Sequence, residues 1–588
     1  MIERIKAGLR ENLLGALDSA RAARVLTLTE KPDVIFEVPK EKAHGELATN
    51  LAMTLARPER KSPRAIAEII LKHLSREGTW VARAEVAGPG FINFYLDPGW
   101  LHQALRELFQ QGPEFGKTSV GQGKKVLVEF VSANPTGPLV IVQARSGAVG
   151  DVLCNLFSWA GFVAHREFYV NDAGNQFLTL ARTMEIRVRQ QLGEELELPE
   201  QAYPGEYVID LARDFLAGDE AAEGRAQGEP MKGQAAALGK AVLDLPEPER
   251  LEKLGRYAVS RIVSWQREVL DRYGAHFDRW FSEQKLRDEQ WPEKVIAMLR
   301  EKGRTYETEG ALWFRSTDFG DDKDRVLIKS DGNYTYFVPD VAYHLNKFER
   351  GYDYVIDILG PDHHGYVSRM RAAIQALGYP ADRFEVLISQ HVRLMRGGEM
   401  VSMSKRAGQI YALGDLLDEV GKDASRFFFL MRSPDSHLDF DLDLAKLQSN
   451  ENPVFYVQYA HARISSILRQ PGTEEYFEVR NGPKDGSAPS PLIDADFSLL
   501  ADESEYDLIR HLASFPEEIV AAALAREPQR LTRYATELAG LFHSFYNRCR
   551  VLGDDRQLTA ARLGLVDATR SVLRSALGIL GVSAPERM

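Results

Sequence analysis

The spacing of apolar residues divides the chain into segments of different period. Between residues 1 and 17, apolar positions recur every three or four residues among charged ones, which predicts an amphipathic surface helix. Residues 34–39 resemble a β-strand and residues 64–73 a helix. Residues 81–96 alternate on either side of a Gly-Pro-Gly turn, a pattern typical of two paired strands. These elements predict a small α+β domain over residues 1–118.

A different pattern begins after a linker rich in glycine and lysine. A short buried-strand pattern at residues 125–131 precedes a helical pattern at 149–160 and a second strand ending at Val170. Strand, helix and strand at this spacing form the βαβ unit of a doubly wound parallel sheet. Residues 177–305 are largely helical and charged and are interpreted as an insertion, after which the sheet resumes near residue 352.

We therefore predict an α/β fold, a Rossmann-type doubly wound parallel sheet, for residues 119–450. From Asn452 onward nearly every segment has helical spacing, apart from a loop near residues 481–491. Residues 451–588 are accordingly predicted to form a separate, all-α bundle.

The composition fits this organisation and limits the partners. At roughly 150 residues per domain, 588 residues suggest about three or four domains. The net charge of −12 means that a nucleic acid would have to meet a local basic surface. The two cysteines, Cys154 and Cys549, are too few for a disulfide framework or a four-cysteine zinc site, so we expect a reducing cytoplasm. No run approaches the roughly 20 apolar residues of a membrane span, and we expect no membrane partner.

Two irregular segments, residues 132–143 and 401–408, are expected at the carboxyl ends of strands, where open parallel sheets bind ligands. In the second, Lys405 and Arg406 stand between glycines. Such a loop can bring positive charge onto a polyphosphate and stabilise the charge that builds on a leaving pyrophosphate. A solvated basic turn is the alternative interpretation.

Several strings resemble a known family. SMSKR, at residues 402–406, is similar to the KMSKS motif of class I aminoacyl-tRNA synthetases. VEFVSANPTGPL, FYVNDAGNQ, GALWFRSTDFGDDKDRVL, NPVFYVQYAHAR and LGVSAPERM narrow the resemblance to arginyl-tRNA synthetases, and AGPGFINF resembles their added N-terminal domain. The resemblance implies an arginine–tRNA ligase. Such an enzyme activates L-arginine with ATP and transfers it from arginyl-adenylate to the 3′-terminal adenosine of tRNA(Arg).

The resemblance also implies where arginine binds. A guanidinium group presents a planar fork of donors, so a selective site needs a carboxylate together with neutral acceptors. Ordinary hydrogen bonding at strand ends is the alternative for each position. The implied arginine-binding residues are Glu129, Ser132, Asn134, Gln143, Tyr336 and Asp340.

Catalysis and ATP binding are assigned in the same way. The implied catalytic residues are Lys405, Ser404 and Gln143, of which Lys405 would meet the phosphates in the transition state. Mg²⁺ would accompany ATP without a protein cage. Zinc is not expected, since adjacent histidines without cysteine partners make a poor site. The implied ATP-binding residues are Val140, Val142, Gly360, Asp362, His363, His364, Met403, Lys405 and Arg406.

The chain departs from the family at its class signature. HIGH should occupy residues 140–143, where this chain has VIVQ, and Ser402 replaces the first lysine of the KMSKR form of the second motif. Either the enzyme is active, with Gln143, Arg145, Ser404 or backbone N–H groups replacing the lost donors, or it binds tRNA or arginine with impaired catalysis. We expect Gln143 to face the cleft and Val140 and Val142 to form an apolar wall. A nicotinamide enzyme is disfavoured because no G-x-G-x-x-G follows the first strand.

The tRNA contacts follow from the resemblance as well. The N-terminal domain would touch the tRNA elbow and the C-terminal bundle would read the anticodon, whose splayed bases stack on aromatic rings. Packing in a helical core is the alternative for each aromatic residue. The expected contacts are Asn93, Tyr95, Phe455, Tyr459, Phe545 and Tyr546. The family-level expectation for the assembly is a monomer.

Overall fold

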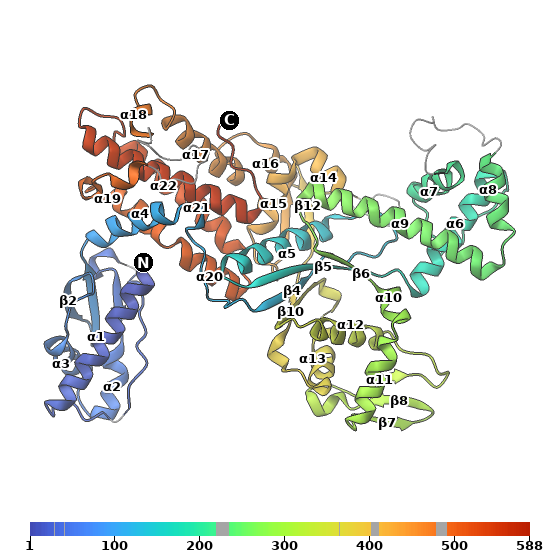
Figure 1. Ribbon diagram of the computed structural model, residues 1–588, viewed down its shortest axis with the longest axis horizontal. Helices are drawn as coiled ribbons and strands as arrows, with labels where there is room; N and C mark the ends of the chain where they lie inside the picture. Colours follow the sequence, from blue (N-terminus) through green and yellow to red (C-terminus); the bar gives the residue numbers. More distant parts are fainter. Residues whose placement is uncertain (29, 40, 219–233, 364, 402–410, 478–490) are drawn as a thin grey trace.

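The computed structural model describes residues 1–588 except 29, 40, 219–233, 364, 402–410 and 478–490. A small N-terminal domain, a central parallel sheet, a helical insertion and a C-terminal helical bundle make up the chain (Figure 1). The N-terminal domain and the insertion lie at opposite ends of the molecule, with the sheet between them. No helix in the described part of the chain is long and apolar enough to span a membrane.

The N-terminal domain joins three helices to an antiparallel sheet of order β1-β3-β2. Helix α3 begins at Pro63, and the Ser62 hydroxyl caps it by accepting from the Ala65 N–H at 3.3 Å. The two strands and the turn expected over residues 81–96 are confirmed. The elements are α1 (Ile2–Ala22), β1 (Leu47–Thr49), α2 (Leu51–Glu59), α3 (Pro63–His73), β2 (Val81–Ala87) and β3 (Phe91–Leu96).

The strand expected at residues 34–39 is wrong. Only Glu37 pairs, in a single bridge to Ala48, while Ile35 and Val38 are exposed. The segment lies at the edge of the sheet, and Pro39, which has no backbone N–H, cannot continue a ladder.

The central sheet has five parallel strands in the order β11-β10-β4-β5-β6, which confirms the predicted fold class. Helix α5 (Ile141–Trp159) connects β4 to β5. The order reverses between β4 and β10, so the ligand crevice of such a fold lies at their carboxyl ends. The strands are β4 (Lys125–Glu129), β5 (Val163–Val170), β6 (Arg279–Ser282), β10 (Tyr354–Leu359) and β11 (Phe384–Ile388).

The helical insertion is shorter than expected. Its four helices share a core of their own and end at Tyr273. Residues 279–282, assigned to the insertion from the sequence, form β6 and pair with β5. A four-residue strand is too short to stand out in a charged segment. The helices are α6 (Gly174–Gln191), α7 (Glu206–Ala217), α8 (Gln234–Leu243) and α9 (Glu247–Tyr273).

The second half of the sheet carries its own covering layer. A small antiparallel sheet of order β7-β8-β9 leads into α12, which packs against α11 and α13. The elements are α10 (Glu283–Asp288), α11 (Trp291–Glu301), β7 (Thr305–Thr308), β8 (Ala311–Phe314), β9 (Arg325–Ile328), α12 (Phe337–Glu349) and α13 (Tyr366–Leu377).

A third small sheet, of order β13-β12-β14, leads to the C-terminal bundle. Helix α4 (Gly99–Gln111) joins the N-terminal domain to that bundle, where Phe109 stacks on Phe497 with ring centroids 5.9 Å apart. The strands are β12 (Val392–Arg396), β13 (Glu399–Met400) and β14 (Leu438–Asp441). The helices are α14 (Leu413–Val420), α15 (Lys422–Leu430), α16 (Leu442–Lys446), α17 (Pro453–Ile467), α18 (Glu474–Phe477), α19 (Glu503–Ala513), α20 (Phe515–Ala525), α21 (Gln529–Arg548) and α22 (Arg556–Leu580).

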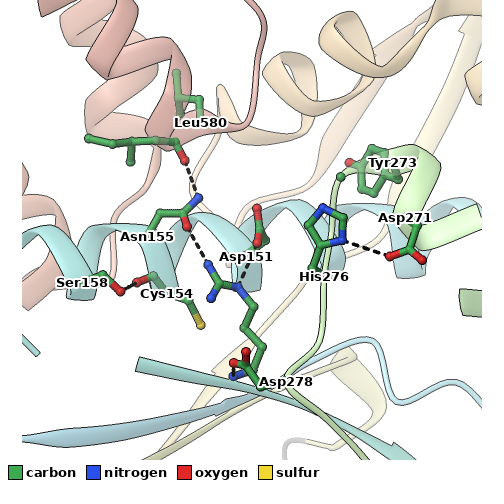
Figure 2. A network of polar contacts seen from close by, with 12 residues as sticks. Asp151, Cys154, Asn155, Ser158, Asp271, Tyr273, His276, Asp278 and Leu580 are labelled. Carbon is green, nitrogen blue, oxygen red and sulfur yellow. Dashed lines mark hydrogen bonds and ion pairs between the residues drawn. The ribbon is translucent and has the colours of Figure 1, made fainter. Parts of the chain in front are cut away.

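A polar network joins the end of α22 to α5 (Figure 2). Arg426, from α15, is fully buried and donates to Asp151 at 2.6 Å and to the Leu580 carbonyl at 2.9 Å. On the other side, Asn155 donates to the Ile579 carbonyl at 2.8 Å and accepts from Arg166 at 2.6 Å. The bundle is thus fixed to the helix that starts at the altered signature.

Gly150 sets how closely α5 can approach the end of β4. A methyl group there would lie 2.2 Å from Cγ of Phe130, whereas at Gly147 its nearest neighbours lie at 3.5 Å. We expect Gly150→Ala to lower the apparent melting temperature, because overpacking costs about 1–3 kcal/mol. Gly147→Ala, in the same helix, should leave it unchanged or raise it. Equal effects in thermal unfolding monitored by circular dichroism would contradict this account.

Candidate functional site

The chain leaves β4 through a strained turn. Val131 and Ser132 have φ of 67° and 36°, in the left-handed region that a β-branched residue such as valine rarely adopts. The Ser132 hydroxyl donates to Glu129 at 2.8 Å and accepts from the Tyr169 N–H at 3.1 Å. The Val131 N–H donates to the Ser146 hydroxyl at 3.1 Å. These bonds hold the turn at the carboxyl edge of the sheet.

Below this edge, Lys347 neutralises two carboxylates. Its ammonium is fully buried and donates to Glu129 at 2.5 Å and to Asp357 at 2.8 Å. The His344 ring lies between Asp357, at 2.7 Å, and the Asp340 carbonyl, also at 2.7 Å. Both ring nitrogens of His344 therefore face oxygen atoms of α12 and β10.

The pKa values follow from this arrangement. Burial acts to raise the pKa of Asp357, but the charges of Lys347 and His344 outweigh it and lower that pKa to about 2. Burial also acts to lower the pKa of Lys347, yet the two carboxylates raise it. Asp357 and Lys347 therefore stay charged, whereas burial raises the pKa of Glu129 against the lowering effect of Lys347. The cluster is an ionic support for α12 against β4 and β10.

Glu129, implied as an arginine ligand, belongs to this support. It is 6 % exposed, and its oxygens are taken by Lys347 and Ser132. A guanidinium would have to compete with Lys347 and Ser132 for these oxygens, so the structure favours a supporting role for Glu129 over a direct charge pair with arginine. The sequence could not reveal this, since Lys347 lies 218 residues away.

Asp340 is in the opposite situation. It lies in the first turn of α12 and is half-buried, and among the described residues its carboxylate has no hydrogen bond or ion pair. Burial, helped by the nearby carboxylates Glu283 and Glu129, raises its pKa to about 7. His344 and Arg369 lower it in part. Such a carboxylate favours the binding of a cation.

Glu283 is a site residue that the sequence reasoning missed. It directly follows β6 and is 7 % exposed. Its carboxylate accepts from the Asn171 amide at 2.7 Å and from Arg287 at 2.5 Å, and its charge reaches Asp340 and Tyr169. A carboxylate at the end of a strand is a recognisable signal in the sequence, but the prediction places β6 within the insertion.

The neutral groups implied for the arginine site lie around the same edge. The side-chain amide group of Asn171 lies 3.4 Å from the side-chain oxygen Oδ1 of Asn134. Tyr336, 75 % exposed at the N-terminus of α12, accepts from the Asn175 amide through its hydroxyl at 3.2 Å. The site therefore combines two carboxylates, amides and a tyrosine from four different segments.

The altered signature forms the start of α5. Val140 is its N-cap and pairs with Ala412 in a single bridge. The side-chain oxygen Oε1 of Gln143 accepts from the Val140 N–H at 2.8 Å, and the side-chain nitrogen Nε2 has no partner among the described residues. Val140, Val142 and Gln143 are half-buried. Gln143 thus caps the helix and keeps a donor to spare.

Arg145 does not replace the lost donors. Its guanidinium is fully buried and donates to the carbonyls of Gln390, Ser433 and Ser436 at 2.7–3.1 Å. Burial lowers its pKa to about 10, still well above neutrality. Arg145 ties α5 to the segments before β12 and β14 and is not available to a phosphate.

The groups expected at ATP are only partly described. Gly360 directly follows β10, and the exposed Asp362 and His363 line a cavity of about 310 Å³ together with Arg325 and Arg369. His364, Met403, Ser404, Lys405 and Arg406 lie outside the described residues. Among the described residues, no group of three histidine, cysteine or acidic side chains could hold a metal ion.

Two of the expected tRNA contacts are buried. Asn93 is 4 % exposed within β3, and Phe545 is fully buried in the bundle core, so neither presents a free face to a nucleotide. Tyr95 is half-buried, with the Arg83 guanidinium 3.7 Å from its ring centroid. Tyr459 and Tyr546 line a cavity of about 880 Å³ together with Arg463, and Phe455 stacks on Tyr459.

Comparisons with known proteins agree along the whole chain. Residues 104–432 match the class I (R) tRNA synthetase catalytic domain, residues 5–96 the arginyl-tRNA synthetase N-terminal domain and residues 457–588 the DALR anticodon-binding domain. The chain is 52 % identical to an arginine–tRNA ligase of Symbiobacterium thermophilum and 47 % identical to one of Desulforamulus reducens, each over the full length of both chains.

A solved structure shares the fold. Thermus thermophilus arginyl-tRNA synthetase superposes with a TM-score of 0.72 over 99 % of this chain and all of that one, at 22 % identity.

Removing the shared cation tests the ionic cluster. We expect Lys347→Met to cost about 3–5 kcal/mol, because it removes the ammonium that Glu129 and Asp357 share and leaves the buried Glu129 without a paired cation. Lys294→Met removes the same charge from an exposed pair with Glu349 and should cost less than about 1 kcal/mol. The measurement is urea unfolding of both variants, and similar shifts would contradict the account.

Proposed function

Because the chain belongs to the arginyl-tRNA synthetase family, we propose that Asp340 is the residue that binds the guanidinium of its substrate, L-arginine. The single observation that carries the proposal is the unpaired Asp340 carboxylate, with its pKa of about 7, at the ligand edge of the sheet. A guanidinium supplies the cation that this carboxylate lacks and donates in a fork that matches it.

The reaction has two steps. The arginine carboxylate attacks the α-phosphorus of ATP, forming an oxygen–phosphorus bond while the bond to pyrophosphate breaks. A ribose hydroxyl of the terminal adenosine of tRNA then attacks the arginyl carbonyl carbon, and AMP leaves. No covalent intermediate with the enzyme is needed, so the protein contributes positioning and charge stabilisation.

The remaining arginine contacts are proposed to come from neutral groups. Glu283 is near enough to raise the pKa of Asp340, but its oxygens are held by Arg287 and Asn171, so it is proposed to add negative charge to the site without pairing with the guanidinium. Asn134 and Tyr336 supply amide and hydroxyl groups, and Ser132 with Glu129 fixes the turn that carries Asn134. This division explains how a site near Glu129 can be acidic without Glu129 pairing with arginine.

For ATP, we propose that Val140 and Val142 form the apolar wall and that Gly360, Asp362, His363 and His364 meet the adenosine. Lys405, with Ser404, Met403 and Arg406, is proposed to close on the phosphates and to stabilise the departing pyrophosphate. Mg²⁺ would enter with ATP, since such ions are held mainly by phosphate and water oxygens.

For tRNA(Arg), we propose that the cavity beside Tyr459 and Tyr546 receives anticodon bases. Aromatic faces with a neighbouring Arg463 suit stacking on single-stranded nucleotides, and Arg463 lies 4.7 Å from the Tyr546 ring. Phe455 extends this aromatic surface, and Tyr95 remains the candidate on the N-terminal domain. We further propose a cytoplasmic enzyme that acts as a monomer.

Charging of tRNA(Arg) with each of the twenty amino acids tests the function. We expect a signal with arginine alone, and binding without charging would instead favour the impaired alternative. In the same assay, Asp340→Asn should raise KM for arginine about 10- to 100-fold, since a charge-assisted pair is lost. An unchanged KM would reject Asp340 as the guanidinium ligand.

The dependence of KM for arginine on pH provides a second test of Asp340. In the free enzyme the pKa of Asp340 is about 7, and only the ionised form binds a guanidinium well. KM for arginine should therefore rise as the pH falls below about 7 and stay level above it. Asp340→Asn should lack this rise, which separates Asp340 from other titrating groups.

Gln143 can be tested by separating its two polar atoms. Gln143→Glu keeps an oxygen that can accept from the Val140 N–H, so the helix cap survives, but it removes the amide donor. If that donor meets the substrates, Gln143→Glu and Gln143→Ala should both lower kcat/KM by more than about tenfold. If Gln143 only caps α5, Gln143→Glu should match the wild type and Gln143→Ala should lose thermal stability.

A further inference from the structure

The loop that carries Asn134 is held from outside the sheet. Residues 134–138, between the strained turn and α5, have no regular secondary structure. Gln266, from α9 of the insertion, donates through its amide nitrogen to the carbonyls of Asn134 at 3.2 Å and Gly137 at 3.0 Å. The Tyr207 hydroxyl, from α7, donates to the Thr136 carbonyl.

These contacts are unlike incidental packing. Gln266 is 2 % exposed, and its side-chain oxygen Oε1 is buried without a partner among the described residues. Leaving a buried acceptor unsatisfied costs free energy, whereas an apolar side chain would avoid that cost. Glutamine is therefore suited to this position by its donor, which satisfies two loop carbonyls at once.

The loop also needs support at this point. It starts from Val131 and Ser132, whose positive φ angles are unfavourable, and strained backbone persists only where its surroundings fix it. It ends where the Leu413 N–H donates to the Leu139 carbonyl at 2.8 Å. Between these two anchors, Gln266 and Tyr207 supply the described side-chain bonds to the backbone.

We propose that Gln266 and Tyr207 are positioning residues for arginine, and that the helical insertion is thereby part of the arginine site. By holding the carbonyls of Asn134, Thr136 and Gly137 in one loop, they fix where the Asn134 side chain lies relative to the other groups of the proposed arginine site. The inference rests on the proposed function, because its consequence is measured on arginine.

The test compares Gln266→Leu, Tyr207→Phe and the control Gln190→Leu in arginine charging. Gln190 also donates to a backbone carbonyl in the insertion, that of Leu196 at 2.6 Å, but does not touch the loop. We expect Gln266→Leu to raise KM for arginine and lower kcat, each about tenfold, as misplacement of a binding group does. Tyr207→Phe should act in the same direction by about threefold, and Gln190→Leu should stay within about twofold.

A double-mutant cycle with Asn134→Ala separates positioning from general destabilisation. If Gln266 acts through Asn134, Gln266→Leu should lose most of its effect in the Asn134→Ala background, whereas full additivity would overturn the proposal. Should Gln266→Leu fail to fold, Tyr207→Phe decides, since it removes a single oxygen. If the wild type charges arginine and Gln266→Leu and Tyr207→Phe are both fully active, only this inference is rejected. If the wild type does not charge arginine at all, the proposed function is rejected.

Discussion

The buried ammonium of Lys347 carries the charge balance on which the substrate edge is built. It joins Glu129 at the end of β4 to Asp357 in β10, the two strands on either side of the topological switch. An uncompensated charge in such a place would cost several kcal/mol, so the ammonium and the two carboxylates must be kept together. Helix α12, which carries Lys347 and His344, is thereby fixed in register with the sheet, and Asp340 is carried on its first turn.

The contrast between Asp357 and Asp340 explains how a buried acidic site can select a cation. Burial acts to raise the pKa of both carboxyl groups. The charges of Lys347 and His344 lower the pKa of Asp357 to about 2, whereas Asp340, near Glu283 and Glu129 and only partly offset by His344 and Arg369, has a pKa of about 7. A bound guanidinium would do for Asp340 what Lys347 does for Asp357. The internal cation Lys347 pairs with Asp357, whereas Asp340 has no cation paired with it among the described residues. One carboxylate thus belongs to a rigid support, and the other is proposed to bind the substrate.

The sequence was sufficient wherever the relevant signal was local. Strand and helix periods predicted the parallel sheet and the bundle, which the structure confirms. With the family resemblance, strand-end reasoning also led to the proposal that Asn134, Tyr336 and Asp340 meet arginine at one edge of the sheet. The sequence did not reveal roles that depend on residues far away in the chain. Lys347 pairs with Glu129, the carbonyls of Gln390 and Ser436 accept from Arg145, and Phe545 packs in the core of the bundle. Glu283 was missed because the short strand before it was hidden in a charged segment.

The missing signature histidines can be understood from the same geometry. Val140 offers no side-chain donor, but the first N–H groups of α5 need no partner within the helix, and a helix N-terminus favours a phosphate. Gln143 binds the Val140 N–H, while the Ile141 and Val142 N–H groups have no acceptor in the described part of the chain. Backbone donors have fixed directions only if the helix start is fixed. Here the Val140–Ala412 bridge, the strained turn and the loop contacts from the insertion fix it. Under the proposed function, these fixed backbone donors would therefore take over part of the phosphate binding that the family resemblance assigns to the missing histidines.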